Sequence, residues 1–201
     1  MNNALIIFIK NPHPGKVKTR LAETMGDASA LHIYKQLLKH TRNISLAVHA
    51  ERFLFYDDCI VKEDEWQNEH FIKQLQTGNN LGERMNNAFT YVFPQCGKAV
   101  IIGSDCFELG PFIINSAFKL LDNNDAAIGP AKDGGYYLLG LKEIQPSLFE
   151  NISWSTSQVL EQTMSICQNL NLKYQLLPIL SDIDVEEDLN TEQGRSFLKN
   201  K

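Results

Sequence analysis

The stretch Ala99-Val100-Ile101-Ile102-Gly103-Ser104-Asp105 decides the fold. Its first four residues form a continuously apolar run, which is typical of a strand that helices cover on both faces of a sheet. In open sheets of that kind, ligands bind beyond the carboxyl ends of the parallel strands. Asp105 therefore stands where a substrate would lie, with Ser104 beside it.

Other apolar segments alternate with helical patterns on both sides of this stretch. We expect strands at residues 5–9, 53–56, 99–102, 126–128, 136–141 and 174–179. Apolar residues recur at helical spacing over two segments, 81–93 and 159–170. This alternation predicts an α/β protein with one domain over residues 1–201, folded as a three-layer α/β/α sandwich around a mostly parallel sheet.

Composition narrows the classes of partner. The 201 residues are 43% hydrophobic and 21% charged, which is typical of a folded globular protein. A formal net charge of −5 disfavours nucleic acid as a partner, because binding a phosphate backbone needs a broad basic face. The longest apolar run, residues 4–9, is too short to cross a bilayer, and no secretory leader pattern opens the sequence. We therefore expect a cytoplasmic protein with no membrane partner.

The cysteines are far apart in the sequence and form no C-x-x-C pair. That spacing favours reduced thiols over disulfides or zinc ligands. The four are Cys59, Cys96, Cys106 and Cys167.

A basic loop, residues 10–20, follows the first predicted strand with the sequence K-N-P-H-P-G-K-V-K-T-R. Four cationic side chains in eleven residues, together with the start of a helix, favour phosphate binding. Arg20 suits a bidentate contact and Lys18 a point charge. The loop is not a Walker P-loop, which requires a different glycine spacing. A solvated turn without function is the alternative.

Acidic residues follow the last apolar segment. In Asp182-Ile183-Asp184, alternating side chains would direct both carboxylates the same way. Together with Asp105 they are hard oxygen ligands suited to Mg²⁺ or Mn²⁺. Ordinary turn and cap aspartates are the alternative, and that is how we interpret Asp188, which opens a predicted C-terminal helix.

A glycine-rich segment, residues 129–140, joins two apolar strands. A β-turn at Asp133-Gly134-Gly135 explains part of it, but Lys132 beside Asp133 adds groups that a simple turn does not need. Farther along, residues 153–157 read Ser-Trp-Ser-Thr-Ser before a predicted helix. A Ser or Thr there would cap the helix, whereas Trp154 would pack or stack on a ligand.

Taken in order, six motifs resemble a family of small bacterial glycosyltransferase-A-like proteins, of the selenodomain-associated or arsenosugar-biosynthesis type. The motifs are K-N-P-H-P-G-K-V-K-T-R-L, L-G-E-R-M-N-N-A-F, G-S-D, G-P-A-K-D-G-G-Y-Y-L-L-G, W-S-T and D-I-D-V-E-E-D-L, spread from Lys10 to about Leu189. The resemblance implies a Rossmann-like nucleotide-diphospho-sugar transferase fold with a mixed sheet. That fold is shared with nucleotidyltransferases.

The resemblance also assigns residues to parts of a site. The nucleotide and its phosphates would be bound by Pro14, Gly15, Lys18, Thr19, Arg20, Asn80, Gly82, Arg84 and Ser104. The metal would be bound by Asp105, Asp182 and Asp184. The substrate pocket would contain Lys132, Gly134, Gly135, Tyr136, Trp154 and Thr156.

Two positions depart from the family pattern. Asn80 stands where relatives carry aspartate before Leu-Gly, and Phe107 stands where they carry proline after Gly-Ser-Asp. The first change removes one polar contact, and the second predicts a different turn. Cys106 lies between Asp105 and Phe107, and we interpret it as a packed thiol rather than a nucleophile because no histidine motif accompanies it.

These patterns predict a metal-dependent transferase that uses a nucleotide-activated donor. The leading interpretation is glycosyl transfer from a nucleoside diphosphate sugar to a small-molecule acceptor, with Asp105, Asp133 and Arg20 as catalytic residues. The first alternative is nucleotidyl transfer from a nucleoside triphosphate with release of pyrophosphate. The second is an inert nucleotide-binding module.

Overall fold

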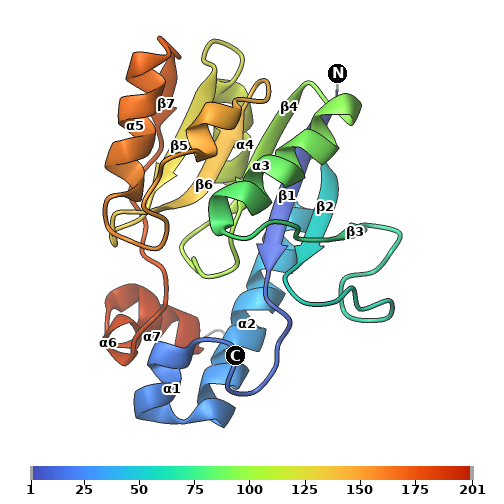
Figure 1. The fold of residues 1–201 in the computed structure, drawn as a ribbon. Coiled ribbons are helices and arrows are strands. Elements are labelled where there is room, and N and C mark those ends of the chain that lie inside the picture. The colour runs from blue at the N-terminus through green and yellow to red at the C-terminus, as the bar shows by residue number, and fades with distance from the viewer. Residues whose placement is uncertain (1, 200–201) are drawn as a thin grey trace.

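The computed structural model describes residues 2–199, which contain one seven-stranded sheet (Figure 1). The strand order is β3-β2-β1-β4-β6-β5-β7, and only β6 runs antiparallel to its neighbours. The strands are β1 Asn3–Ile9, β2 Glu51–Tyr56, β3 Ile72–Leu75, β4 Lys98–Ile102, β5 Ala126–Pro130, β6 Tyr136–Leu141 and β7 Tyr174–Leu176. The predicted mostly parallel mixed sheet is confirmed.

Helices cover both faces of the sheet. The helices are α1 Thr19–Met25, α2 Asp27–Leu46, α3 Leu81–Val92, α4 Pro111–Leu120, α5 Val159–Asn169, α6 Glu186–Leu189 and α7 Glu192–Lys199, with short 3₁₀ turns η1 Phe93–Gln95 and η2 Pro146–Phe149, and those that cover the sheet are α2 to α5. In Figure 1, α3 and α5 lie in front of the sheet and α4 behind it. The predicted three layers are therefore present.

The alternation of β1 explains these layers. Leu5, Ile7 and Ile9 pack in a core with residues of α2 and α4, whereas Ala4, Ile6 and Phe8 pack in a second core with residues of α3 and α5. Successive side chains of a strand point to opposite faces, so a strand that is apolar throughout needs a cover on each side. Almost all of β1 is buried for this reason.

A third apolar cluster lies beyond the sheet edge at which β1 ends. It joins α1 and α2 to α6 and α7 through Leu21, Ile33, Leu189 and Phe197. In Figure 1 these helices lie together below the arrowhead of β1. The cluster brings the first two helices and the last two helices of the described chain together at this end of the strands.

The antiparallel strand β6 has a consequence for the site. Because β6 begins where β4 and β5 end, the loop 131–135 lies at the same edge as Gly103 and the residues that follow it. The N–H of Gly103 donates to the carbonyl of Tyr137 across that edge, at 3.4 Å.

The elements depart from the sequence predictions in two ways. Strand β3 and helices α2 and α4 were not predicted, and β7 ends at Leu176 rather than at Ile179, because Pro178 has no N–H for a ladder. All four cysteines are free, as expected. None of the helices within residues 2–199 has the length and hydropathy needed to cross a bilayer.

Candidate functional site

Three residues far apart in the sequence meet at the end of the sheet where the parallel strands have their carboxyl ends. The Lys18 ammonium nitrogen lies 2.7 Å from an oxygen of Asp105 and 2.7 Å from an oxygen of Asp184. The lysine side chain is 4% exposed, whereas the two carboxylates are 45% and 41% exposed. Each carboxylate therefore contacts the buried ammonium and also faces solvent. We call this arrangement the Lys18 triad.

Local structure positions each member of the Lys18 triad. Asp105 follows the end of β4, and its carbonyl accepts the N–H of Ile183 at 3.0 Å. That bond holds the segment 180–184 across the ends of the strands. The segment follows β7 and extends the parallel pairing with β5 through a bridge between Ala131 and Leu180. Lys18 is the N-cap of α1 in a left-handed conformation, with φ 49° and ψ 46°.

Asp188 fixes the other end of that segment. Its carboxylate accepts the N–H groups of Asp184 and Val185 at 2.8 and 2.9 Å, at the start of α6. Our interpretation of Asp188 as a helix-start residue is confirmed. It supports the site indirectly, because it holds the backbone of Asp184.

Opposite charges control the protonation of Lys18. Burial lowers the pKa of an ammonium, but the charges of Asp105 and Asp184 outweigh it, so the pKa of Lys18 is raised. The lysine therefore carries its charge throughout the neutral range. It is the buried cation that balances this part of the acidic edge.

The negative charges that favour the charged form of Lys18 favour the neutral form of Asp182. Burial, followed by the negative charges of Asp105 and Asp184, raises its pKa to about 7. Asp133 adds a smaller repulsion, and Lys18 offsets part of the total. The carboxylates of Asp105, Asp133, Asp182 and Asp184 thus form one electrostatic group.

Replacing Asp182 by asparagine is expected to stabilise the metal-free protein at pH 8 and to change little at pH 4. The carboxyl titrates near 3.8 when unfolded and at about 7 when folded. Its ionisation therefore costs stability that grows through this window and is complete above it. We expect a gain of about 4 kcal/mol at pH 8 in denaturant unfolding.

The matched control for that measurement is Asp122→Asn, because Lys98 lowers the pKa of Asp122. This variant should show no gain at pH 8. An equal gain for Asp182→Asn at both pH values would contradict the electrostatic origin of the effect.

The Lys18 triad bears on the predicted metal site. Two carboxylates already converge on one cation, the Lys18 ammonium, and that donor set fits a magnesium that takes one or two carboxylates and fills its octahedron with water and phosphate oxygens. Within residues 2–199, no three His, Cys, Asp or Glu side chains are arranged to hold a metal together. A closed cage of Asp105, Asp182 and Asp184 is therefore not preformed.

Ser104 and the unpredicted Tyr34 join the ends of two strands. The Tyr34 hydroxyl accepts the N–H of Lys10 at 2.7 Å, donates to the Lys10 carbonyl at 3.1 Å and lies 3.3 Å from the Ser104 hydroxyl. Both residues are buried. Ser104 therefore positions the start of the basic loop. A polar tyrosine on an otherwise apolar helix face was the sequence signal for Tyr34, which becomes visible once α2 is recognised.

The basic loop is anchored at its start and open farther along. Asn11 is buried, and its side-chain oxygen accepts the N–H groups of Asp58 and Cys59. Farther along, the exposed residues include the predicted phosphate contacts Pro14, Gly15, Thr19 and Arg20. Among the described residues the Arg20 guanidinium has no hydrogen bond or ion pair, so its five N–H donors face solvent.

The start of α3 is built for capping and close packing. Asn80 is the N-cap, and its side chain accepts the N–H of Glu83 at 2.9 Å. A Cβ on Gly82 would lie 2.4 Å from the indole nitrogen of Trp154, so only glycine fits there. Arg84 donates from Nε to the carbonyl of Gly78 at 3.2 Å. The polar groups of Asn80 and Arg84 are thus used within the protein.

The glycine-rich loop lies at the same edge. Asp133 is exposed and accepts the N–H of Gly135 at 2.9 Å, which confirms the predicted turn. Lys132 is exposed as well, and its N–H donates to the carbonyl of Leu180. Tyr136 differs from its predicted place in a substrate pocket: its hydroxyl is directed to the sulfur of Met85, 3.9 Å away in the α3 core.

Gly134 and the segment before α5 are interlocked. Gly134 has φ +89°, and an added Cβ would lie 2.2 Å from the carbonyl oxygen of Ser157. Its own carbonyl accepts the N–H of Leu160 at 2.9 Å. The prediction that a Ser or Thr side chain caps α5 is wrong, because Gln158 is the N-cap and no side chain caps the helix. The exposed Thr156 accepts the Gln158 N–H one turn earlier, at 3.3 Å.

The residues after Asp105 turn inward. Cys106 is buried, and burial together with Asp182 raises the pKa of its thiol, so the interpretation as a packed thiol is confirmed. The ring of Phe107 packs 4.7 Å from that of His40 and 5.1 Å from that of Phe197. Phe107 thus links the turn after β4 to the helices beyond the sheet, which proline in that position would not do.

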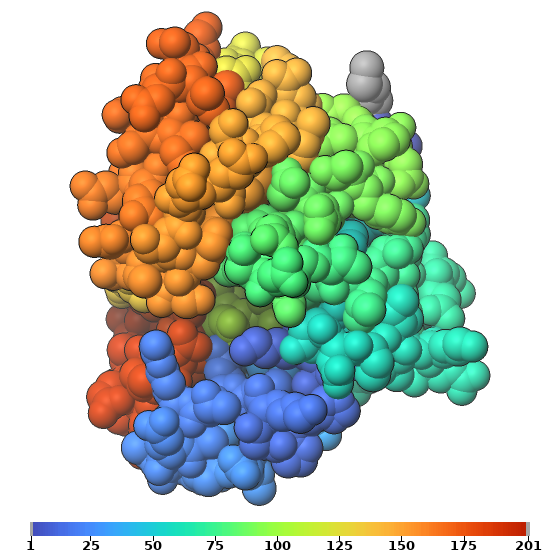
Figure 2. All heavy atoms as spheres, viewed as in Figure 1, coloured from blue at the N-terminus to red at the C-terminus, as the bar shows by residue number. Residues whose placement is uncertain are grey.

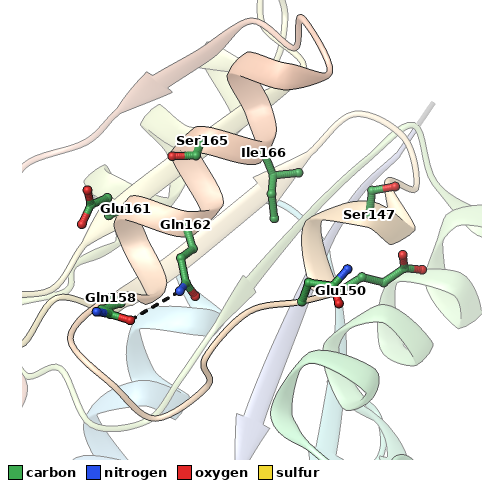
Figure 3. Close-up of a pocket in the computed structure, with 8 residues that line it drawn as sticks. Ser147, Glu150, Gln158, Glu161, Gln162, Ser165 and Ile166 are labelled. Atoms are coloured by element: carbon green, nitrogen blue, oxygen red, sulfur yellow. Dashed lines mark hydrogen bonds between the residues drawn. The ribbon is translucent and has the colours of Figure 1, made fainter.

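The hollows of the surface include one at the strand ends and one away from them. In Figure 2 a recess opens between the start of α3 in green, the segment before α5 in orange and the blue and red helices below, with the segment after β4 at its floor. A separate pocket of about 620 Å³ lies between η2 and α5 and is lined mostly by polar side chains such as Glu150 and Gln162 (Figure 3). It contains none of the predicted site residues, and we keep the candidate site at the strand ends.

Solved structures similar to this chain include nucleotide-using enzymes. A proposed nucleotide-diphospho-sugar transferase from Desulfovibrio desulfuricans G20 is 28% identical, with a TM-score of 0.87 over 98% of this chain and 94% of the other. The 4-diphosphocytidyl-2C-methyl-D-erythritol synthase of Anaerococcus prevotii DSM 20548 is 10% identical, with a TM-score of 0.62 over 98% and 96%.

A third structure is CMP:2-keto-3-deoxy-manno-octonic acid synthetase in complex with CTP. It is 9% identical, with a TM-score of 0.61 over 99% of this chain and 100% of the other. At such identities the two synthases show the fold alone. The predicted nucleotide-diphospho-sugar transferase fold is confirmed.

No curated protein matches the sequence. The sequence profile of one bacterial family matches residues 40–156, which is more than half of the chain. The chain therefore belongs to the family described as "Uncharacterized protein conserved in bacteria (DUF2064)".

Proposed function

We propose that this protein transfers a glycosyl group from a nucleoside diphosphate sugar to a small acceptor. The Lys18 triad carries the proposal: it sets one buried cation and two half-exposed carboxylates at the strand ends, where ligands of such sheets bind. The likeness to the Desulfovibrio desulfuricans G20 protein, proposed as a nucleotide-diphospho-sugar transferase, supports the choice of donor.

The side chains divide the work of such a reaction. Lys18 and Arg20 would bind the donor's phosphates, since an ammonium supplies a point charge and a guanidinium a bidentate fork. Asp105 and Asp184, with Asp182 beside them, would hold Mg²⁺ or Mn²⁺, which when bound supplies positive charge against the departing diphosphate. Asp133 is exposed at the same edge, where it would accept a proton from the acceptor hydroxyl or orient it.

Nucleotidyl transfer is the second candidate, and the unpaired Arg20 favours it. A guanidinium whose donors all face solvent suits a triphosphate, which offers more anionic oxygens than a diphosphate sugar. In this reaction a phosphorylated acceptor would attack the α-phosphate, and pyrophosphate would leave. Cytoplasmic residence fits either reaction and is part of the proposal.

Product analysis separates the two reactions. The protein is incubated with Mg²⁺ or Mn²⁺ and either nucleoside diphosphate sugars or nucleoside triphosphates with sugar phosphates. Release of nucleoside diphosphate is the expected result, and release of pyrophosphate would replace glycosyl with nucleotidyl transfer. Calorimetry with the same nucleotides tests the shared premise: an absence of nucleotide binding, with and without metal, would overturn both proposals.

A further inference from the structure

Lys18 differs from an ordinary surface lysine in how it is held. Its backbone is fixed in the left-handed region at the N-cap of α1, and its side chain is 4% exposed. Two of its three ammonium donors are directed to Asp105 and Asp184. The ammonium therefore occupies a defined position between the two carboxylates instead of sampling solvent.

That position excludes a second cation. Magnesium binds carboxylate oxygens at about 2.0–2.1 Å. The Lys18 nitrogen lies 2.7 Å from one oxygen of Asp105 and 2.7 Å from one of Asp184. A metal bound to those same oxygens would overlap the ammonium in space and repel its charge. The metal and the ammonium are thus alternatives at these two oxygens.

A bound phosphate would offer the Lys18 ammonium an alternative partner. Lysine has a flexible four-carbon stem, so its nitrogen can move by several ångströms while its backbone stays in place. An anionic phosphate above the half-exposed carboxylates would accept the ammonium's N–H groups and bring metal ligands of its own. Binding of the donor would then exchange the partner of Lys18 and release the two carboxylate oxygens together.

We propose that Lys18 is a built-in competitor of the divalent metal: its ammonium closes the pair Asp105 and Asp184 until the donor's phosphates draw it away. The inference rests on the proposed function for the identity of the phosphate ligand. It makes metal binding conditional on the nucleotide, so the nucleotide-free protein binds metal weakly. It assigns Lys18 a role toward the carboxylates that is separate from its contact with phosphate.

The test is the affinity of the nucleotide-free protein for Mn²⁺ alone, followed by electron paramagnetic resonance of the free ion. Lys18→Met keeps an unbranched side chain that is one atom shorter and removes its charge. We expect this variant to bind Mn²⁺ about tenfold more tightly than the wild type, or better, because the competing cation is gone. Adding Asp105→Asn to Lys18→Met should abolish the gain.

The chain supplies a matched control in Lys98→Met. Lys98 is the first residue of β4, whereas Asp105 follows the end of that strand. Because Lys98 pairs with Asp122, its replacement removes an Asp–Lys pair away from the Lys18 triad. Lys18→Gln provides a second neutral variant if Lys18→Met is poorly folded by circular dichroism. Wild-type Mn²⁺ affinity in either folded Lys18 variant, or an equal gain in Lys98→Met, would overturn the inference.

A measurement on the wild type is independent of folding defects. Amine labelling read by mass spectrometry should show Lys18 reacting faster at saturating Mn²⁺ than without metal, relative to Lys98. Unchanged labelling of Lys18 while Mn²⁺ is bound would overturn the inference. The proposed function fails by a different result, the absence of nucleotide binding, so the two failures are distinguishable.

Discussion

An Asp105→Asn variant is expected to lose about a thousandfold in kcat/KM for transfer from the nucleotide donor. Asparagine keeps the shape of the side chain but removes the negative charge that contacts Lys18 at 2.7 Å. The site would then retain one of the two carboxylates that converge on the cation. Steady-state kinetics with the donor identified by product analysis measures the loss.

The control is Asp122→Asn, because the partner of Asp122 lies at the opposite end of β4 from Asp105. Asp122 forms its own ion pair with Lys98, at the start of β4, whereas Asp105 follows the end of β4. Both variants thus lose the charge of an Asp–Lys pair, but only one pair lies where ligands bind. Activity of Asp105→Asn within about threefold of wild type would remove this residue from the catalytic site.

A Gly134→Ala variant is expected to lose about 3 kcal/mol of unfolding free energy or more. The backbone at this position has φ +89°, and the added Cβ would lie 2.2 Å from the Ser157 carbonyl oxygen. The obstacle is backbone, which cannot rotate away as a flexible side chain does. The loop 131–135 and the segment before α5 would have to separate, with loss of the bond from Leu160 to the Gly134 carbonyl.

Two other glycines separate the contribution of backbone strain from that of the steric clash. Gly26 has φ +80° but open space around its Cβ direction, so Gly26→Ala reports backbone strain alone, about 1 kcal/mol. Gly110 has a negative φ of −125° and open space, so Gly110→Ala should change stability little. Urea unfolding of the three variants should rank them in this order, and a Gly134→Ala loss no larger than that of Gly26→Ala would refute the clash.

The sheet was largely predictable from the sequence because its strands carry their signal locally. Residues 5–9 and 99–102 are apolar without interruption, and the segment at 136–141 is nearly so. Their burial on both faces is a property of each segment by itself. Strand β3 was missed because only Ile72 and Leu75 of its four residues are apolar, and none of the four is buried.

The sequence singled out the residues of the Lys18 triad as candidates but did not predict their ion pairs. Positions after apolar strands identified Asp105 and Asp184, and the charge density of residues 10–20 identified the basic loop. The ion pairs of Lys18 could not be predicted, because they depend on a left-handed N-cap and on a segment held 166 residues away along the chain. Likewise, the direction of the Tyr136 hydroxyl toward Met85 depends on packing that spans distant elements.

The separation of Lys18 and Asp184 along the chain also bears on how the protein is made. Strands β1, β2 and β4 can pair once about half of the chain has emerged from the ribosome, whereas Asp184 emerges much later. The triad is thus among the long-range contacts that can form only late in synthesis, and closing it costs the entropy of a very large loop. A nascent chain can therefore pair these three strands before the Lys18 triad exists, so the proposed donor and metal would meet the triad only after Asp184 has been synthesised.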